Sequence, residues 1–186
     1  MNAMNPLRLI GLLLVVGLVG CAGKNVVRLE YQAAGIPPES CNKSIAVVRL
    51  NDSREQAAIG ETNEGVPFYS TTAVADWVSK ALSDELRRTG CRVDYHEKEY
   101  NFDTDYTLTG DIVEAYAKQS SLTAYQADMR LSIALKAGGK KVFGKTYVSS
   151  VSKTTAPSPG ANSKILTELL QVMLREMVPE IRKNLQ

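Results

Sequence analysis

"ADMRLSIALKAGGKKVFGKTY", residues 127–147, is the stretch that decides the fold, because it predicts two strands joined by a tight turn. Apolar and polar side chains alternate along its first half, with the period of a strand that buries one face. The apolar positions are Met129, Leu131, Ile133 and Leu135, and the polar ones are Arg130, Ser132 and Lys136. Two glycines at 138–139 are a hairpin turn signal. We therefore predict antiparallel strands over 124–137 and 140–155, with one face open to water.

Three further strands are expected before this hairpin. The same alternation continues over 105–119, where Tyr106, Leu108 and Ile112 alternate with polar residues. Runs rich in β-branched residues predict strands over 43–52 and 91–97. Residues 52–70 carry charges and turn formers, so we expect a loop there.

Two amphipathic helices are predicted from apolar residues at helical spacing. Ser70, Thr71 or Thr72 can cap the first helix, and Gly90 stops it. Its apolar stripe comprises Val74, Trp77, Val78, Ala81, Leu82 and Leu86. The stripe of the second comprises Ile165, Leu166, Leu169, Leu170, Met173, Leu174, Met177 and Ile181. Pro179 is expected to bend or weaken the last turn.

The order of elements is β-α-β, then β-β-β, then α. It predicts an α+β two-layer sandwich, a mixed and mostly antiparallel sheet with two helices packed on one face. The other face of the sheet is expected to be solvated or to lie against a partner.

An apolar run near the N-terminus, "LLLVVGLVGCAG" at residues 12–23, has the features of an export signal. Residues 9–19 are all apolar or glycine, and a helix of that length spans roughly 16 Å, about half of a bilayer core. One basic residue, Arg8, and no acidic residue precede the run. This order is typical of a secretory signal peptide, and the alternative is a buried core helix.

The end of this run, Leu18-Val19-Gly20-Cys21, resembles the lipobox of bacterial lipoproteins. The resemblance implies a diacylglycerol on the Cys21 thiol, cleavage just before Cys21 and acylation of the new amine. One acyl chain holds a protein only marginally, whereas about three hold it stably. Ala22 stands where aspartate would favour retention in the inner membrane, so the resemblance implies an outer-membrane anchor facing the periplasm.

These assignments divide the chain into three parts. Residues 1–20 are expected to be a lipoprotein signal peptide, residues 21–42 a lipidated flexible tether, and residues 43–186 a single periplasmic α+β domain. The net charge of the whole chain is +2, and removing Arg8 with residues 1–20 lowers it to about +1. So small a charge argues against a nucleic-acid partner.

Cys41 and Cys91 are a candidate disulfide. Export places them in an oxidising compartment, where pairing is favoured. Each precedes a predicted strand, so two neighbouring parallel strands would bring both thiols to one end of the sheet. The alternative is two separate buried thiols. A metal site is not expected, since His96 is the single histidine.

No catalytic residue and no cofactor are predicted. The carboxylates Asp103 and Asp105 could act as an acid–base pair, but such a pair more often caps a turn. Asp52, Ser53 and Arg54 follow a strand end, where sites occur in α/β proteins, yet no base accompanies the serine, and a local Asp–Arg pair is the expected role.

Two single residues and one group of lysines have ordinary structural interpretations. His96 is expected to be solvated and Trp77 to lie in the core. The lysines gather around the predicted hairpin and could contact anionic headgroups or a cell-wall polymer, or simply protect an exposed edge: Lys136, Lys140, Lys141, Lys145 and Lys153.

Taken together, several segments resemble the YajG-like bacterial lipoproteins. They are the lipobox, "IAVVRLNDSRE" at 45–55, "VADWVSKALSDELRRTGCRV" at 74–93, the hairpin at 127–147 and the late amphipathic helix, so the likeness covers roughly residues 9–185. It implies location and architecture more than activity. Similar small lipoproteins serve as accessory subunits of envelope machines, among them lipid-handling transporters and peptidoglycan synthases.

The expected function is therefore that of a membrane-anchored, non-enzymatic binding or accessory subunit with an envelope protein as partner. The alternatives are a periplasmic carrier of lipid or glycan and an activator of a peptidoglycan synthase. An enzyme is not expected.

Overall fold

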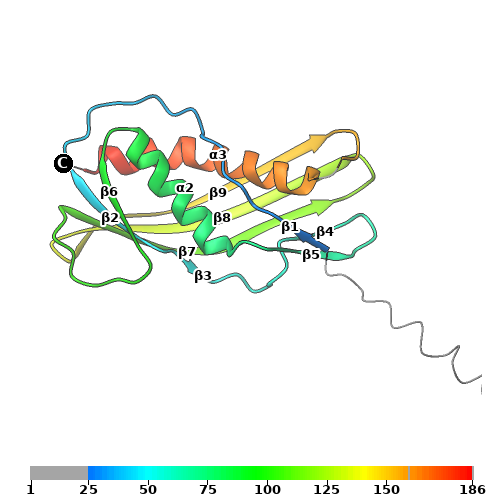
Figure 1. Cartoon of the computed structure of the whole chain (residues 1–186), viewed down its shortest axis with the longest axis horizontal. Coiled ribbons are helices and arrows are strands. Elements are labelled where there is room, and N and C mark those ends of the chain that lie inside the picture. The colour runs from blue at the N-terminus through cyan, green and yellow to red at the C-terminus, as the bar shows by residue number, and fades with distance from the viewer. Residues whose placement is uncertain (1–24, 159, 186) are drawn as a thin grey trace, which may run out of the picture.

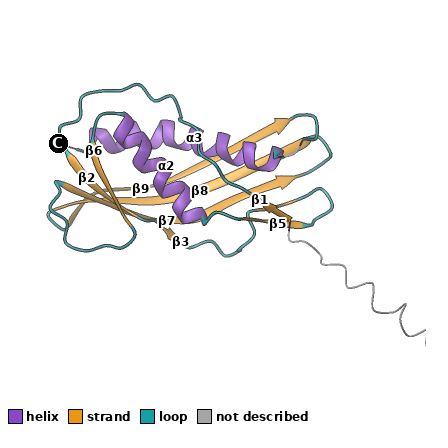
Figure 2. Ribbon diagram, in the orientation of Figure 1, coloured by secondary structure: helices purple, strands orange, loops and turns teal. Residues whose placement is uncertain are grey.

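The computed structural model describes residues 25–158 and 160–185, which form a sheet and a layer of two helices (Figures 1 and 2). The expected signal peptide of residues 1–20 and the expected lipidation site, Cys21, lie outside the described residues. The strands are β1 (Asn25–Val27), β2 (Ser44–Val48), β3 (Asn51–Asp52), β4 (Gly60–Glu61), β5 (Pro67–Ser70), β6 (Arg92–His96), β7 (Tyr106–Gln119), β8 (Ala124–Ala137) and β9 (Lys140–Thr154). The helices are α2 (Val74–Arg88) and α3 (Ala161–Lys183).

The long strands β7, β8 and β9 form an antiparallel meander, as their alternating sequences predicted. On its other edge β7 pairs in succession with β2, β3 and β4, each parallel to it. β6 extends the sheet beyond β2, and β5 followed by β1 extends it beyond β4. The sheet is thus mixed, and its longest ladders are antiparallel.

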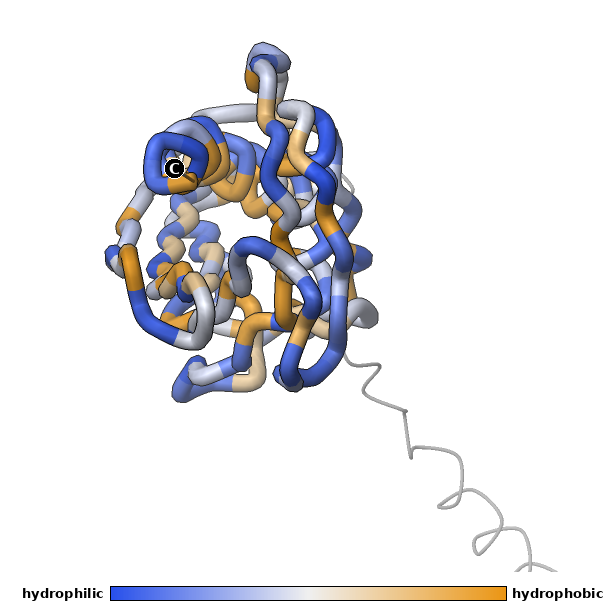
Figure 3. The backbone as a smooth tube through the Cα atoms, turned by 90° about the vertical axis from the view of Figure 1, so that its left-hand side faces the viewer, coloured by the Kyte–Doolittle hydropathy of each residue, from blue (hydrophilic) through white to orange (hydrophobic). Residues whose placement is uncertain are grey.

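Both helices cover the same face of this sheet. α3 packs on β7, β8 and β9, whereas α2 packs on β2, β3 and β6 and touches α3. Viewed from one end of the molecule, apolar stretches of the chain gather in the interior (Figure 3). Leu82, Leu170 and Leu131 are fully buried in this one core. The predicted two-layer α+β sandwich is confirmed.

Local differences from the prediction occur where elements are short. The strand expected over 43–52 is divided into β2 and β3, and the loop expected over 52–70 contains the β4–β5 hairpin. None of Ser70, Thr71 and Thr72 caps α2: the residue before the helix is Ala73, and no side chain caps it. The hydroxyl of Ser70 instead accepts a hydrogen bond from the backbone N–H of Thr72 at 3.0 Å. The last helix continues past Pro179 to Lys183.

The described part of the segment expected to be a flexible tether belongs to the fold: residues 25–27 form β1, which pairs with β5, and the residues after them pack on the helices. Side chains of both helices donate hydrogen bonds to its backbone carbonyls: Trp77 to Glu30 at 3.2 Å, Thr167 to Glu30 at 3.0 Å, Gln171 to Gln32 at 2.9 Å and Arg175 to Ala34 at 2.8 Å. Arg182 also pairs with Glu39 at 2.6 Å. We call residues 28–42 the strap. Folded structure is therefore present from Asn25 on, well before residue 43.

A buried carboxyl group holds the strap to α2. Glu85 is almost fully buried, and its Oε1 accepts hydrogen bonds from the hydroxyl of Tyr31 and from the backbone N–H of Ala34, the latter at 2.8 Å. Burial, together with the hydrogen bond to Glu85, raises the pKa of Tyr31 far above its ordinary value of 10.0. The sequence gives no sign of this contact, because Ala34 and Tyr31 lie 51 and 54 residues away from Glu85 along the chain.

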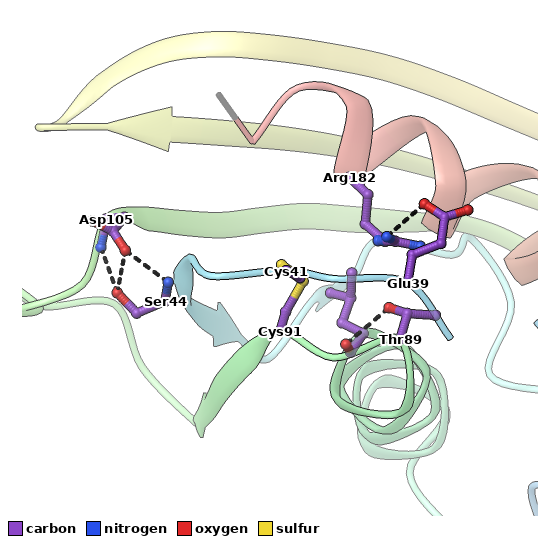
Figure 4. Close-up of a disulfide and its surroundings, with 8 residues drawn as sticks. Glu39, Cys41, Ser44, Thr89, Cys91, Asp105 and Arg182 are labelled. Atoms are coloured by element: carbon purple, nitrogen blue, oxygen red, sulfur yellow. Dashed lines mark hydrogen bonds and ion pairs between the residues drawn. A yellow bond between two sulfur atoms is a disulfide. The ribbon is translucent and has the colours of Figure 1, made fainter. Parts of the chain in front are cut away.

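A disulfide joins the end of the strap to the start of β6. Cys41 and Cys91 are bonded, with an S–S distance of 2.00 Å, and they lie just before β2 and β6 (Figure 4). These strands are parallel neighbours, with Ser44 opposite Arg92. Gly90 adopts φ +97°, and a Cβ atom there would lie 2.5 Å from the carbonyl oxygen of Glu39, so a side chain would collide with the strap.

Candidate functional site on the open face of the sheet

The helices leave the opposite face of the β7–β8–β9 meander uncovered, and we call it the open face. Its residues alternate with buried ones such as Leu108, Met129 and Tyr147, which face the helices. The open face comprises Thr107, Thr109, Asp111, Glu114, Tyr116, Gln126, Asp128, Arg130, Ser132, Lys136, Thr146, Val148, Ser150 and Ser152. It is thus mostly polar, with many hydroxyl groups and charges of both signs.

Contacts across neighbouring strands order part of this face. Arg130 lies opposite Glu114, and their charged groups are 3.6 Å apart. The hydroxyls of Ser132 and Thr146 are hydrogen-bonded at 3.2 Å. Val148, directly opposite Arg130, is among the most exposed large apolar side chains of the described residues. Such cross-strand pairs contribute roughly 0.2–1 kcal/mol each.

A cavity lies beside the open face where the sheet has a gap. β3 pairs with β7 up to Ile112 and β4 pairs with it from Ala117, so no described strand pairs with this edge of β7 between them. The register between β7 and β8 also shifts just after Ile112, as in a β-bulge. Residues 53–56, Ala58, residues 113–116 and Arg130 together line a cavity of about 380 Å³.

Arg54 forms one wall of this cavity and is held firmly in place. Its Nε and Nη2 donate hydrogen bonds to the two carboxylate oxygens of Asp52 at 2.7 and 2.8 Å, and its Nη1 donates to the carbonyl oxygen of Ala58 at 3.3 Å. The Arg54 side chain is only 9% exposed. Its hydrogen bonds hold the pKa of Asp52 below the ordinary value of 3.8. A bidentate pair of this kind fixes the geometry of the loop.

The charges that line the cavity are balanced. Arg54 and Arg130 face it together with Glu55 and Glu114. The cavity therefore offers donors and acceptors of both signs without a field that would select a polyanion. Polar groups of this mixed kind are typical of the rim of a protein interface.

The structure gives the carboxylates of Asp103 and Asp105 different surroundings. Asp105 accepts hydrogen bonds from the backbone N–H and the hydroxyl of Ser44, both at 2.7 Å, and these lower its pKa below the ordinary value of 3.8 (Figure 4). Asp105 thus ties the start of β7 to the start of β2. Asp103 is exposed in the preceding turn. Ser53 donates a hydrogen bond to Asp111 at 3.3 Å.

His96 and Trp77 occupy different environments. The ring of His96 packs against Tyr100 and Phe102, with centroids 5.1 and 4.4 Å away, and Tyr100 is hydrogen-bonded to its Nδ1 at 2.9 Å. Trp77 is buried, as expected, and its Nε1 donates to the strap.

Most of the hairpin lysines are engaged in ion pairs. Lys136 pairs with Glu99 at 2.5 Å, Lys153 with Glu168 at 2.7 Å and Lys145 with Glu180 at 2.7 Å. The hydrogen bond to Glu180 raises the pKa of Lys145. Burial and a hydrogen bond to the same glutamate raise the pKa of Tyr147. Lys140 and Lys141 lie exposed at the start of β9. Three of the five lysines thus hold β8 and β9 to their surroundings.

Sequence reasoning missed the cavity, although one signal for it exists. In β7 the buried residues fall at even positions up to Ile112 and at odd positions from Ala115, so the alternation changes phase where the register shifts. A change of phase within a strand indicates a bulge. Arg130 carries no comparable signal, because one charged residue on the polar face of a strand is ordinary.

Residues 25–158 and 160–185 contain neither a candidate metal site nor a candidate membrane-spanning helix. No three His, Cys, Asp or Glu side chains in these ranges are placed to share a metal ion. Within the same ranges, neither helix has the length and apolar character needed to cross a membrane.

Known proteins resemble this chain in fold alone. Neither a protein-family model nor a curated protein matches its sequence. A Xanthomonas campestris protein described as belonging to the DUF330 family has a similar structure, with a TM-score of 0.63 and 12% identity over 86% of this chain and 95% of its own. An uncharacterised protein aligns with a TM-score of 0.54 and 11% identity over 88% of this chain and 99% of its own. Protein CT253 of Chlamydia trachomatis aligns with a TM-score of 0.50 and 11% identity over 78% and 98%. At such low identities these likenesses support the two-layer architecture and nothing about activity.

Proposed function

We propose that this protein is an envelope lipoprotein of the YajG-like kind, anchored through Cys21 to the outer membrane and facing the periplasm. In this proposal the folded domain has no enzymatic activity and binds another envelope protein through its open face. It serves as an accessory subunit of the complex that this partner forms.

The position of Cys21 is the observation that carries the proposal. The cysteine ends the apolar run and stands four residues before Asn25, the first described residue and the start of β1. A signal peptide for ordinary secretion needs no cysteine at its cleavage site, whereas lipidation requires one. The placement of Cys21 between an export signal and a folded domain therefore supports an anchor.

The open face supports a binding role for the domain. It is a polar surface on three long strands, backed by a fully packed core, and it adjoins the cavity at Arg54. A preorganised surface of this kind can bind a partner with little loss of conformational entropy. Val148 supplies an exposed apolar side chain near the centre of β9.

Photo-crosslinking in living cells tests this role. A photoreactive amino acid at Val148, on the open face, is expected to capture one defined envelope protein. The same amino acid at Val172, an exposed position on α3, is the matched control and should capture none. Ser150→Arg should abolish the capture from position 148, because a charge left unpaired in an interface costs roughly 2–5 kcal/mol.

Other outcomes of this experiment would count against the proposal. Equal capture from positions 148 and 172 would mean that the open face has no special role. Capture of lipid alone from position 148 would favour the carrier function instead.

A further inference from the structure

The first described residue, Asn25, lies at the same end of the domain as three connections between elements: the β4–β5 turn, the β7–β8 turn and the loop between β9 and α3. Asn25 of β1 lies opposite Phe68 of β5, Phe68 lies opposite Gly60 of β4, and Gly60 lies opposite Ala117 near the end of β7. The turn after β4 and the turn after β7 therefore lie at the end where the chain enters the fold, on the right in Figure 1.

The loop between β9 and α3 lies at this end as well, because Thr154 at the end of β9 pairs with Ala124 at the start of β8. We call this region the entry end. It comprises residues 25–27, 62–66, 120–123 and 155–158.

The entry end is almost free of charge. Its 16 residues include one ionisable side chain, Glu64, although 23% of the residues of the whole chain are charged. It also presents three of the large apolar side chains that are most exposed in the described residues. Leu122 is 67% exposed, Val26 is 55% exposed and Val66 is 41% exposed. Hydroxyl groups, amides and isolated apolar side chains suit the boundary between headgroups and acyl chains.

The short connection to Cys21 limits how far the entry end can stand from a membrane. Four residue steps separate Cys21 from Asn25, and even a fully extended chain covers only about 14 Å over four steps. The headgroup layer on one side of a bilayer is itself roughly 5–8 Å thick. A lipid on Cys21 therefore brings the entry end to the bilayer surface.

We propose that the entry end rests on the lipid bilayer and inserts Leu122 into its interface, so that the long strands stand away from the membrane. This inference rests on the proposed anchor at Cys21. The opposite end, at the β8–β9 turn, lies about 45 Å away, since β8 has 14 residues at about 3.4 Å each. The open face is then presented to the periplasm rather than covered by lipid.

Depth-dependent quenching of tryptophan tests this orientation. The full lipidated protein is reconstituted into phosphatidylcholine vesicles whose acyl chains are brominated or unmodified. Leu122→Trp places a reporter at the entry end, and Val142→Trp, at a position 51% exposed beyond the far turn, is the matched control. Both variants retain the buried Trp77, which supplies a constant background.

The emission added by Leu122→Trp is expected to shift to shorter wavelength and to be lost in brominated vesicles, whereas that added by Val142→Trp should survive. The adhesion is expected to resist high salt, since the entry end carries almost no charge.

Three results would overturn the inference. No quenching at position 122 in protein that floats with the vesicles would leave the anchor intact and refute the orientation. Quenching at both positions would show that the domain lies flat. A blue shift at position 122 without quenching would show that a second protein copy covers the entry end. Protein that fails to float would instead refute the anchor, and with it the proposed function.

Discussion

Replacing Cys41 and Cys91 together with alanine is expected to lower the free energy of unfolding by about 4 kcal/mol. The bridge closes a loop with a sequence separation of 50, and loss of that restraint increases the entropy of the unfolded chain. It also frees the end of the strap from the start of β6. Urea-induced unfolding of residues 22–186, followed by the fluorescence of the buried Trp77, measures the difference.

Reduction of the unmodified chain with dithiothreitol serves as the control, because it opens the same bridge without removing a side chain. It should reproduce most of the loss. A loss below about 1 kcal/mol in both experiments would contradict the view that the bridge restrains the fold.

Glu85→Ala is expected to lower the free energy of unfolding by roughly 2–3 kcal/mol. The substitution removes the acceptor of the Tyr31 hydroxyl and the nearer of the two acceptors of the Ala34 backbone N–H, which keeps only its 3.1 Å contact with the Tyr31 hydroxyl. A buried donor without an acceptor costs about 1–3 kcal/mol. The strap should therefore separate from the helices before the core unfolds. Hydrogen exchange at residues 28–42 should accelerate more than exchange in β8.

Asp84→Ala provides a neighbouring control on the same helix. Asp84 is half-exposed and pairs with Arg87 at 2.9 Å, so its loss should change stability by less than about 1 kcal/mol. If both variants behave alike, or if exchange accelerates uniformly, Glu85 does not hold the strap.

The sequence allowed the larger elements to be predicted because burial imposes a period on long segments. Alternation at Met129, Leu131 and Ile133 identified a strand with one buried face, and the two glycines after it identified the turn. The apolar stripe from Ile165 to Ile181 identified α3 in the same way. The fold class followed from the order of these elements.

Short or non-periodic features could not be predicted from the sequence. β3 and β4 have two residues each, too few to show any period. The strap is held by hydrogen bonds from side chains to backbone carbonyls, and a carbonyl acceptor leaves no trace in the residue types. Its residues were therefore expected to form a tether. The cavity at Arg54 depends on a gap between two such short strands.

The packed strap changes what an anchor at Cys21 implies. A flexible tether of some twenty residues would allow the domain to sample a wide zone above the membrane. A connection of only four residue steps, from Cys21 to Asn25, would instead hold it against the surface in a restricted range of orientations. The open face and the entry end thus have separate roles in our proposals, the first toward a protein partner and the second toward lipid.

The intact mass of the protein purified from bacterial membranes tests the central claim most directly. The account predicts a chain that begins at Cys21, lacks residues 1–20 and carries the added mass of a thiol-linked diacylglycerol and an amide-linked acyl chain. A chain that retains residues 1–20, or one with an unmodified Cys21, would contradict it.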